Sequence, residues 1–417
     1  MSIHSQENLT LSSELAPAIS VWRADLQFWS LTGAIALVGL ALGTVLPLTA
    51  LELERAGQSS ALIGLLMALH AFGLMLALPL TMPAVNRFGA RRVLQWAGAG
   101  AALVCSLLPQ ADTPLGVGAG LLGLGVLLGL SFNLVEAWVN AILPDARRGT
   151  WLALHCTLFT LFQLSGPLLL QWLPGVQAYA VCAALLLLAM PICSFLNERS
   201  FDESGDNDAT TPAEAPEQQR WWTLLLTAPA IVWSTALFAL FDALVLSLLP
   251  IYGRQHGLDE SLALLSASVV LAGDTALEWL VGLLADRCGR LPVHLGCAVL
   301  LLLAAPLLPL AVGHWLWWPL LFLIGGAAGG IYVLSLMASG QRYSGRRLLR
   351  MTALLGAAWG AASCVGPLLT GVLMQVSVSW ALPGVLLGCA AILLPALAWE
   401  EFQLRRQNVS EGKGQST

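Results

Sequence analysis

Four carboxylic acids lie inside long apolar stretches of this chain, and no Lys or Arg lies in the central part of any of those stretches. An ionisable side chain at the centre of a membrane-spanning helix costs about 2.5–3.5 kcal/mol, so each acid requires a chemical reason. A carboxyl group without a basic partner can take up and release a proton, or bind a cation. The four acids are Glu136, Asp242, Asp274 and Glu278.

Three of these acids belong to the second half of the chain. Asp274 and Glu278 are four residues apart, so they share one face of a helix. Asp242 lies eight residues before Pro250, which places it about 12 Å below the end of its helix. We expect Asp242, Asp274 and Glu278 to bind the coupling proton or the substrate. The alternative for each is a buried acid that is hydrogen-bonded to a neighbouring helix for packing.

Glu136 and His155 lie on either side of a short loop at 142–149, each about five residues from the end of its apolar stretch. The two stretches must run antiparallel, so both side chains lie at the same depth. Glu136 could share a proton with His155, or pair with Arg147 or with an arginine of the loop at 87–92. The sequence predicts a latch or a structural pair here.

Two further polar residues lie within apolar stretches. His70 is a candidate for the coupling or substrate site, with a satisfied core histidine as the alternative. Gln163 is a candidate hydrogen-bonding group for a substrate.

The elements that must position these residues are membrane-spanning helices. Hydrophobic residues make up 57% of the 417 residues and charged residues only 10%, too few to coat a water-facing surface. A helix needs about 20 apolar residues to cross the hydrocarbon core. Twelve such runs occur, at about 28–50, 61–84, 93–110, 115–141, 150–172, 176–197, 222–250, 261–284, 293–312, 315–338, 349–374 and 379–399.

Basic residues predict the orientation, because Lys and Arg are retained on the cytoplasmic side. With both termini in the cytoplasm, 17 of the 19 basic residues lie inside and only Arg55 and Arg254 lie outside. The expected protein is a multi-pass protein of the bacterial inner membrane. Its expected parts are a cytoplasmic tail at 1–27, a six-helix bundle at 28–197, an acidic cytoplasmic linker at 198–220, a second six-helix bundle at 221–400 and a cytoplasmic tail at 401–417.

The chain repeats itself at an offset of 200 residues without gaps. Each half is therefore a version of one six-helix unit, and two such units moving about a central site provide alternating access to the two sides of a membrane. The coinciding residues are Gly57 and Gly257, Gly73 and Gly273, Arg87 and Arg287, Gly89 and Gly289, Gly129 and Gly329, and Gly166-Pro167-Leu168-Leu169 with Gly366-Pro367-Leu368-Leu369.

The loop from Gly282 to Arg290 resembles the loop signature of the major facilitator superfamily, a Gly-x-x-x-Asp-Arg-x-Gly-Arg pattern between the second and third helices of each half. The first-half loop departs from it, because Asn86 replaces the acid and Met82 the leading glycine. The resemblance covers the whole chain, and the stretch 134–140 is similar to the YcaD-like subgroup. It implies an all-α membrane protein with twelve transmembrane helices in two pseudo-symmetric six-helix bundles.

The loop residues are expected to act as a latch that holds one conformer closed. The alternative is that they serve only as topology anchors. The Gly-Pro pairs are expected to kink their helices where neighbours slide, because proline removes a backbone hydrogen bond. The candidate latch residues are Arg87, Arg91, Arg92, Asp286, Arg287 and Arg290, together with Glu136 and His155, and the candidate hinges are Gly166, Pro167, Gly366 and Pro367.

These features favour a proton-coupled secondary transporter of a small organic molecule, embedded as a monomer in the lipid bilayer. The Gly-Pro pair in the fifth span partly matches a motif of drug/proton antiporters, so export is slightly preferred over import. A uniporter, a sodium-coupled importer and a non-transporting membrane sensor are the alternatives. The sequence has no phosphate-binding loop, no HExxH motif and no Cys/His cluster, so we expect no enzyme, no metal, no cofactor and no nucleic-acid partner.

Overall fold

The structure, a computed structural model, describes residues 3–143, 148–173, 175–193, 196, 225–343 and 345–414. The regular structure within these residues is helical, as expected for a chain whose backbone polar groups must be satisfied inside a bilayer. The helices are α1 (Ile3–Arg55), α2 (Ser60–Phe88), α3 (Ala90–Leu107), η1 (Leu108–Gln110), α4 (Pro114–Ile142), α5 (Arg148–Leu169), α6 (Val176–Cys193), α9 (Pro229–Ser247), α10 (Leu249–Gln255), α11 (Glu260–Cys288), α12 (Arg290–Ala304), η3 (Ala305–Leu307), α13 (Leu308–Ala311), α14 (Trp317–Arg342), α15 (Gly345–Val376) and α16 (Val378–Gly414).

Eleven helices in the described part of the chain are long and apolar enough to cross a membrane. A shorter apolar helix, Val176–Pro191, lies within the span that the sequence predicts at 176–197. The prediction of many membrane-spanning helices is therefore confirmed, and the count of twelve stays a prediction. The linker at 198–220 lies outside the described residues.

Some helix ends differ from the predicted spans. The seventh predicted span is interrupted at Leu248, between α9 and α10, where Pro250 follows and cannot donate a backbone hydrogen bond. The first and last spans continue as helix into the predicted tails, because α1 begins at Ile3 and α16 ends at Gly414.

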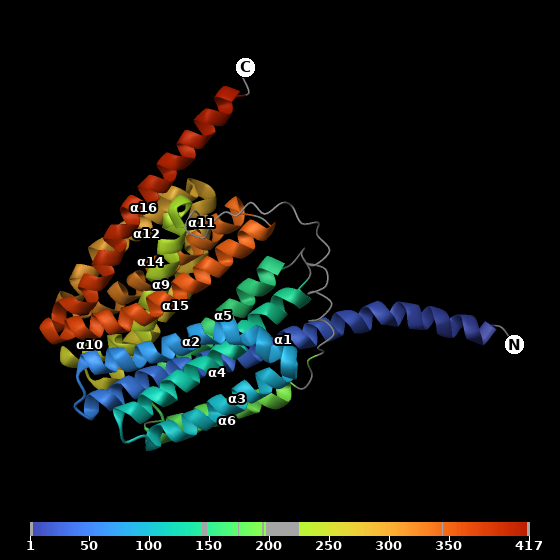
Figure 1. Cartoon of the computed structure of the whole chain (residues 1–417), viewed down its shortest axis with the longest axis horizontal. Coiled ribbons are helices and arrows are strands. Elements are labelled where there is room, and N and C mark those ends of the chain that lie inside the picture. Colours follow the sequence, from blue (N-terminus) through green and yellow to red (C-terminus); the bar gives the residue numbers. More distant parts are fainter. Residues whose placement is uncertain are drawn as a thin grey trace.

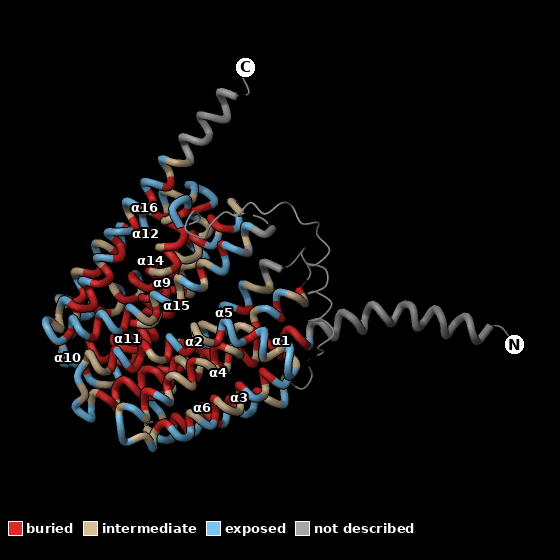
Figure 2. Tube along the Cα trace, in the orientation of Figure 1, coloured by how far each residue is buried: buried red, intermediate tan, exposed pale blue. Residues whose placement is uncertain are grey.

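Helices α1 to α6 lie together on one side of the molecule, and α9 to α16 lie together on the other (Figure 1). Within the first group, α2 packs on α4 and α1 on α5; within the second, α11 packs on α14 and α9 on α15. The two groups meet where α2 packs on α15 and α5 on α11. Buried residues gather on the faces where helices meet, and many outward-facing residues are exposed and apolar, as lipid contact requires (Figure 2).

The tightest helix crossings occur at glycines and recur 200 residues later. A Cβ atom on Gly73 of α2 would overlap the carbonyl oxygen of Leu122 on α4, and one on Gly273 of α11 would overlap that of Phe322 on α14. Small residues permit such close approach of membrane helices. The repeated sequence landmarks therefore correspond to repeated contacts.

The two Gly-Pro pairs have different surroundings. Helix α5 ends at Leu169, two residues after Pro167, whereas α15 continues past Pro367 to Val376. The carbonyl oxygen of Pro367 occupies the space that a side chain at Gly64 of α2 would need, so this pair lies at the contact between the two helix groups. A hinge role for either pair stays a prediction.

The glycine crossings lead to a stability prediction. Gly273→Ala should lower the free energy of unfolding in detergent by about 1–3 kcal/mol, because the added methyl group overlaps the backbone of α14. Gly384→Ala in α16 is the matched control, since a Cβ atom there meets nothing within 4 Å. Denaturant titration of the two purified variants checks this, and equal effects would contradict the role of the crossing.

Candidate functional site

Asp274 is placed by the α11–α14 crossing. Its side chain is 5% exposed, and its carboxylate lies against Gly329 of α14, where any larger residue would displace it. Its Oδ1 atom accepts no hydrogen bond from a described residue. This oxygen is therefore available to a proton or to a donor on a ligand.

Asp242 on α9 and Glu278 on α11 lie close enough to Asp274 to interact with it electrostatically. Both side chains are partly exposed, unlike that of Asp274. The structure thus brings together the three second-half acids that the sequence singled out. We call Asp242, Asp274 and Glu278 the acid cluster.

An aromatic group beside the acid cluster was not found from the sequence. The ring of Tyr332 on α14 stacks on Phe238 of α9 at a centroid distance of 4.8 Å and an angle of 7°. Trp359 of α15 packs edge-on against both rings, 5.7 Å from Phe238 and 5.3 Å from Tyr332. We call Phe238, Tyr332 and Trp359 the aromatic cluster.

Tyr332 connects the aromatic cluster to both helix groups. It follows Gly329 by three residues, so it lies on the α14 face that receives Asp274. It interacts electrostatically with Asp274 and Glu278 of α11, and also with Glu136 of α4 and Cys156 of α5. Two acids of the second group and one acid of the first group therefore lie within electrostatic range of one aromatic residue.

Glu136 and His155 lie side by side. The Nε2 atom of His155 is 3.3 Å from Glu136 Oε1, outside hydrogen-bond geometry, and the contact is an ion pair when the histidine is protonated. The Nδ1 atom of His155 bonds Thr32 Oγ1 of α1 at 2.9 Å, which fixes the ring. Arg147, the alternative partner of Glu136, lies outside the described residues. A latch role for the pair stays a prediction.

His70 and Gln163 lie at helix crossings. His70 is buried between α2 and α4, and neither ring nitrogen bonds a described residue. Gln163 is buried on α5, and its backbone carbonyl packs against Gly43 of α1. Neither residue contacts the acid cluster through a hydrogen bond or ion pair in the described part of the chain.

The predicted latch residues of the second half lie at the end of α11 and the start of α12. Asp286 and Arg287 are exposed, and Asp286 makes no ion pair with a described residue. Arg290 donates to Gln341 Oε1 of α14 at 2.9 Å. The neighbouring Arg342 forms an ion pair with Glu400 of α16, which the sequence reading missed.

The predicted latch residues of the first half, Arg87, Arg91 and Arg92, are exposed at the corresponding loop. Arg87 lies over the ring of Phe88, 5.5 Å from its centroid. Arg91 and Arg92 are both exposed, and Arg91 interacts with another residue. A gating role for these arginines stays a prediction.

A set of polar contacts joins the two helix groups at the ends of α1 and α10. Arg55 forms an ion pair with Glu260, and Glu54 lies 3.7 Å from Arg254. Gln255 donates to Ser60 Oγ at 3.3 Å. The contacts follow the repeat at the offset of 200 residues. The pair of residues 55 and 260 corresponds to the pair of residues 255 and 60, and residue 54 corresponds to residue 254, its own partner. We call these six residues the clasp.

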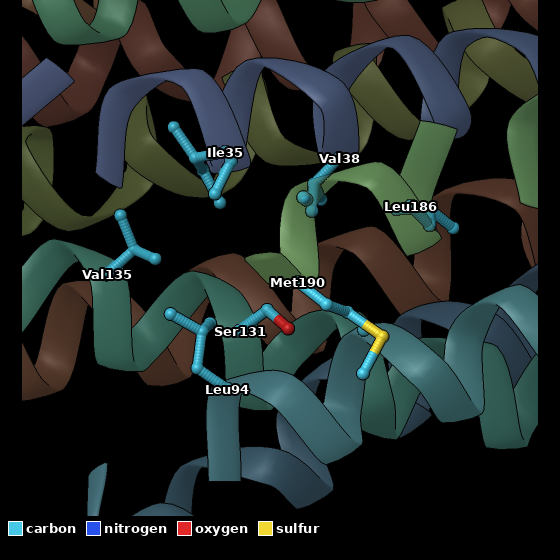
Figure 3. A pocket seen from close by; sticks show the side chains of 10 residues that line it. Ile35, Val38, Leu94, Ser131, Val135, Leu186 and Met190 are labelled. Atoms are coloured by element: carbon cyan, nitrogen blue, oxygen red, sulfur yellow. The ribbon is translucent and has the colours of Figure 1, made fainter. Parts of the chain in front are cut away.

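The best-defined cavity does not contain the acids. It lies among α1, α3, α4 and α6, is lined by apolar side chains such as Ile35 and Leu186, and has a volume of about 20 Å³ (Figure 3). This is room for about one water molecule, not for an organic substrate. In the second half, a hydrogen bond of 2.9 Å joins Ser234 and His294 at the positions that correspond to the cavity residues Ala34 and Leu94.

The sequence model of the Major Facilitator Superfamily matches residues 28–276 and 232–416. The chain belongs to this superfamily. This membership agrees with the resemblance of the loop at 282–290, and eleven helices in the described part of the chain are long and apolar enough to cross a membrane. Membership of the YcaD-like subgroup stays a prediction.

Similarity to individual proteins agrees with membership of this superfamily. An uncharacterized MFS-type transporter of Yersinia enterocolitica is 26% identical over 265 residues, which span 60% of this chain and 63% of that protein. The multidrug resistance protein MdtM of Salmonella typhimurium is 28% identical over 175 residues, 42% of this chain and 41% of that protein. The crystal structure of the nucleoside transporter NupG superposes with a TM-score of 0.71 at 13% identity, covering 90% of this chain and 98% of that chain, which shows a shared fold.

The Glu136–His155 contact should carry interaction energy. A double-mutant cycle of Glu136→Gln and His155→Leu should be non-additive by about 0.5–3 kcal/mol in the free energy of unfolding, because the two groups share one contact. Glu136→Gln with His294→Leu is the control and should be additive, since His294 bonds Ser234 instead. Additivity in both cycles would show that the 3.3 Å approach has no energetic content.

Proposed function

We propose that this superfamily member is a proton-coupled secondary transporter that moves a small organic molecule across the bacterial inner membrane by alternating access. The observation that carries the proposal is the acid cluster, with Asp274 Oδ1 unpartnered by the described residues and lying deep among the helices. A buried carboxyl group that no base neutralises is a group that can carry a proton across a membrane. Both termini are cytoplasmic in this proposal, and the chain works as a monomer.

The two-bundle organisation, 28–197 and 221–400, is part of the proposal. It is supported by the glycine crossings that recur at an offset of 200 residues. It is also supported by the turns at Gly57 and Gly257 and at Gly89 and Gly289, all four with positive φ, which favours glycine. A pseudo-two-fold axis along the membrane normal would relate the bundles, and α6, as the sixth span of the first bundle, would bring the total from eleven to twelve.

The clasp supports alternating access. With both termini in the cytoplasm, as proposed, the clasp lies on the periplasmic side, and that side is then the closed one. The packing of Gly64 on Pro367 and of Gly371 on Ser60 closes the same end between α2 and α15. Surface ion pairs of this kind contribute about 0–1 kcal/mol each, which is small enough to break in every transport cycle.

Export is the favoured direction. The relative MdtM is named as a multidrug resistance protein, and this supports removal of a compound from the cell. A uniporter or sodium-coupled importer would use the same acids to bind the substrate or a cation. Uptake into everted vesicles with an imposed pH gradient, screened across a substrate library, separates these functions, because a uniporter would not accumulate its substrate.

The acid cluster makes a prediction about coupling. Asp242→Asn, Asp274→Asn or Glu278→Gln should abolish uphill transport driven by a pH gradient when the changed residue carries the proton. The same variant should retain substrate exchange without a gradient, because exchange needs no net proton movement. Both activities are measured at matched expression. Full pH-driven uptake in all three variants would exclude the acid cluster as the proton carrier and would direct attention to Glu136 and His155.

The clasp makes a prediction about conformation. Glu260→Gln removes the ion pair with Arg55 and should therefore favour opening of this side. The rate at which an impermeant maleimide labels Ser268→Cys from the periplasmic side should rise by up to about fivefold, which corresponds to the free energy of one exposed ion pair. Ser268 is a suitable reporter because it is buried between the groups, where it donates to the carbonyl oxygen of Leu164. Ala56→Cys, in the exposed loop beside the clasp, should label equally in both backgrounds. An unchanged rate at Ser268→Cys would contradict a clasp that holds this side closed.

A further inference from the structure

The four intramembrane acids interrupt the internal repeat. At an offset of 200 residues every one of them corresponds to a leucine: Asp242 to Leu42, Asp274 to Leu74, Glu278 to Leu78 and Glu136 to Leu336. The contact at Asp274 follows the repeat, since Gly329 packs on Asp274 where Gly129 packs on Leu74. Packing at this position is therefore satisfied by leucine, and the acid serves another purpose.

The aromatic residues, in contrast, follow the repeat. Phe132 and Phe159 form an edge-to-face pair at 5.8 Å and 67°, and the corresponding Tyr332 and Trp359 form one at 5.3 Å and 64°. Each helix group thus presents an aromatic pair of the same geometry. In the second group Phe238 adds a third ring.

The first-group pair lies on helix faces that turn toward Tyr332. Glu136 follows Phe132 by four residues on α4, and Cys156 precedes Phe159 by three on α5, so each shares a face with its aromatic neighbour. Both Glu136 and Cys156 interact electrostatically with Tyr332. Acids and aromatic rings therefore converge from both groups on one region.

The charge of this region is of one sign. The described groups that interact with Asp274 are Glu278 and Asp242, and those that interact with Tyr332 are acids and Cys156. Among the described residues, His155 is the basic group that lies close to this region, beside Glu136. An anionic ligand would meet repulsion here, whereas a cation would gain from the carboxylates and from the faces of the rings.

The partial exposure of this region indicates that a ligand can reach it. Asp242, Glu278, Tyr332 and Trp359 keep part of their surface accessible although they lie on faces that meet other helices. Cys156 is exposed, and it lies within electrostatic range of Glu136 on α4 and of Glu278 on α11. The Oδ1 atom of Asp274, which lies within electrostatic range of Asp242 and Glu278, is buried and has no hydrogen-bond partner among the described residues.

We propose that the acid cluster and the two aromatic groups form a binding site for an organic cation with an aromatic or bulky apolar body. The carboxylates neutralise its charge, and the rings of Tyr332, Trp359 and Phe238 contact its apolar body and its cationic centre. This inference rests on the proposed transport function and names the substrate class of the same site.

Cys156 allows the proposal to be tested before the natural substrate is known. In a variant with Cys156 as its sole cysteine, tetraphenylphosphonium should slow modification by N-ethylmaleimide, a neutral reagent. Tetraphenylborate, an anion of the same shape, should protect only at a concentration at least about tenfold higher, because the acids raise the local concentration of cations. Glu278→Gln and Trp359→Leu should each weaken protection by the cation, and Asp274→Asn should do so if the variant remains monodisperse.

The control is a variant with Cys288 as its sole cysteine, which is exposed at the end of α11, away from the proposed site. Neither ion should protect Cys288. Equal protection of Cys156 by both ions, or protection that survives both Glu278→Gln and Trp359→Leu, would overturn the organic-cation site. Proton-driven uptake of a neutral or anionic compound would also overturn it, and would leave the proposed transport function intact.

Discussion

The close crossing of α11 and α14 is the contact on which the candidate site depends. Glycines at 273 and 325 let the two backbones approach so closely that a side chain at either position would overlap the other helix. This approach seats Asp274 against Gly329 and, one turn further along α14, brings Tyr332 into electrostatic range of the same carboxylate. Without water in a bilayer core, a buried acid of this kind persists only where packing fixes its surroundings.

The first half contains the same helix crossing but has no acidic residue at it. Gly73 and Gly125 bring α2 and α4 together as Gly273 and Gly325 bring α11 and α14 together. Leucine fills the position of the acid there, so the repeated scaffold supplies geometry and the second half supplies charge. Such an asymmetric site on a symmetric frame agrees with the rule that function resides in residues placed on a fold rather than in the fold itself.

The contacts between the two helix groups differ in character along the molecule. At the clasp they are an exposed ion pair, Arg55–Glu260, a partly buried one, Glu54–Arg254, and a hydrogen bond, and the exposed contacts cost little to break. At Gly64 and Pro367 they are backbone contacts that leave no space for side chains. Near Tyr332 they are electrostatic interactions among acids and partly exposed side chains. A transporter that alternates between two states needs weak contacts, such as those of the clasp, at the end that opens. It also needs contacts between the helix groups at its centre that can rearrange.

The sequence by itself determined the membrane-spanning class, the superfamily, the repeat and the identity of the intramembrane acids, because hydropathy, residue spacing and the cost of buried charge are local properties. The tertiary structure decided which polar residues meet. It joined Glu136 to His155 but left His70 without a hydrogen-bond partner among the described residues. It also paired Arg55 and Arg254 with acids of the opposite helix group. The aromatic cluster also emerged only there, because Phe238, Tyr332 and Trp359 come from three helices, and no spacing along the chain records how helices rotate toward one another.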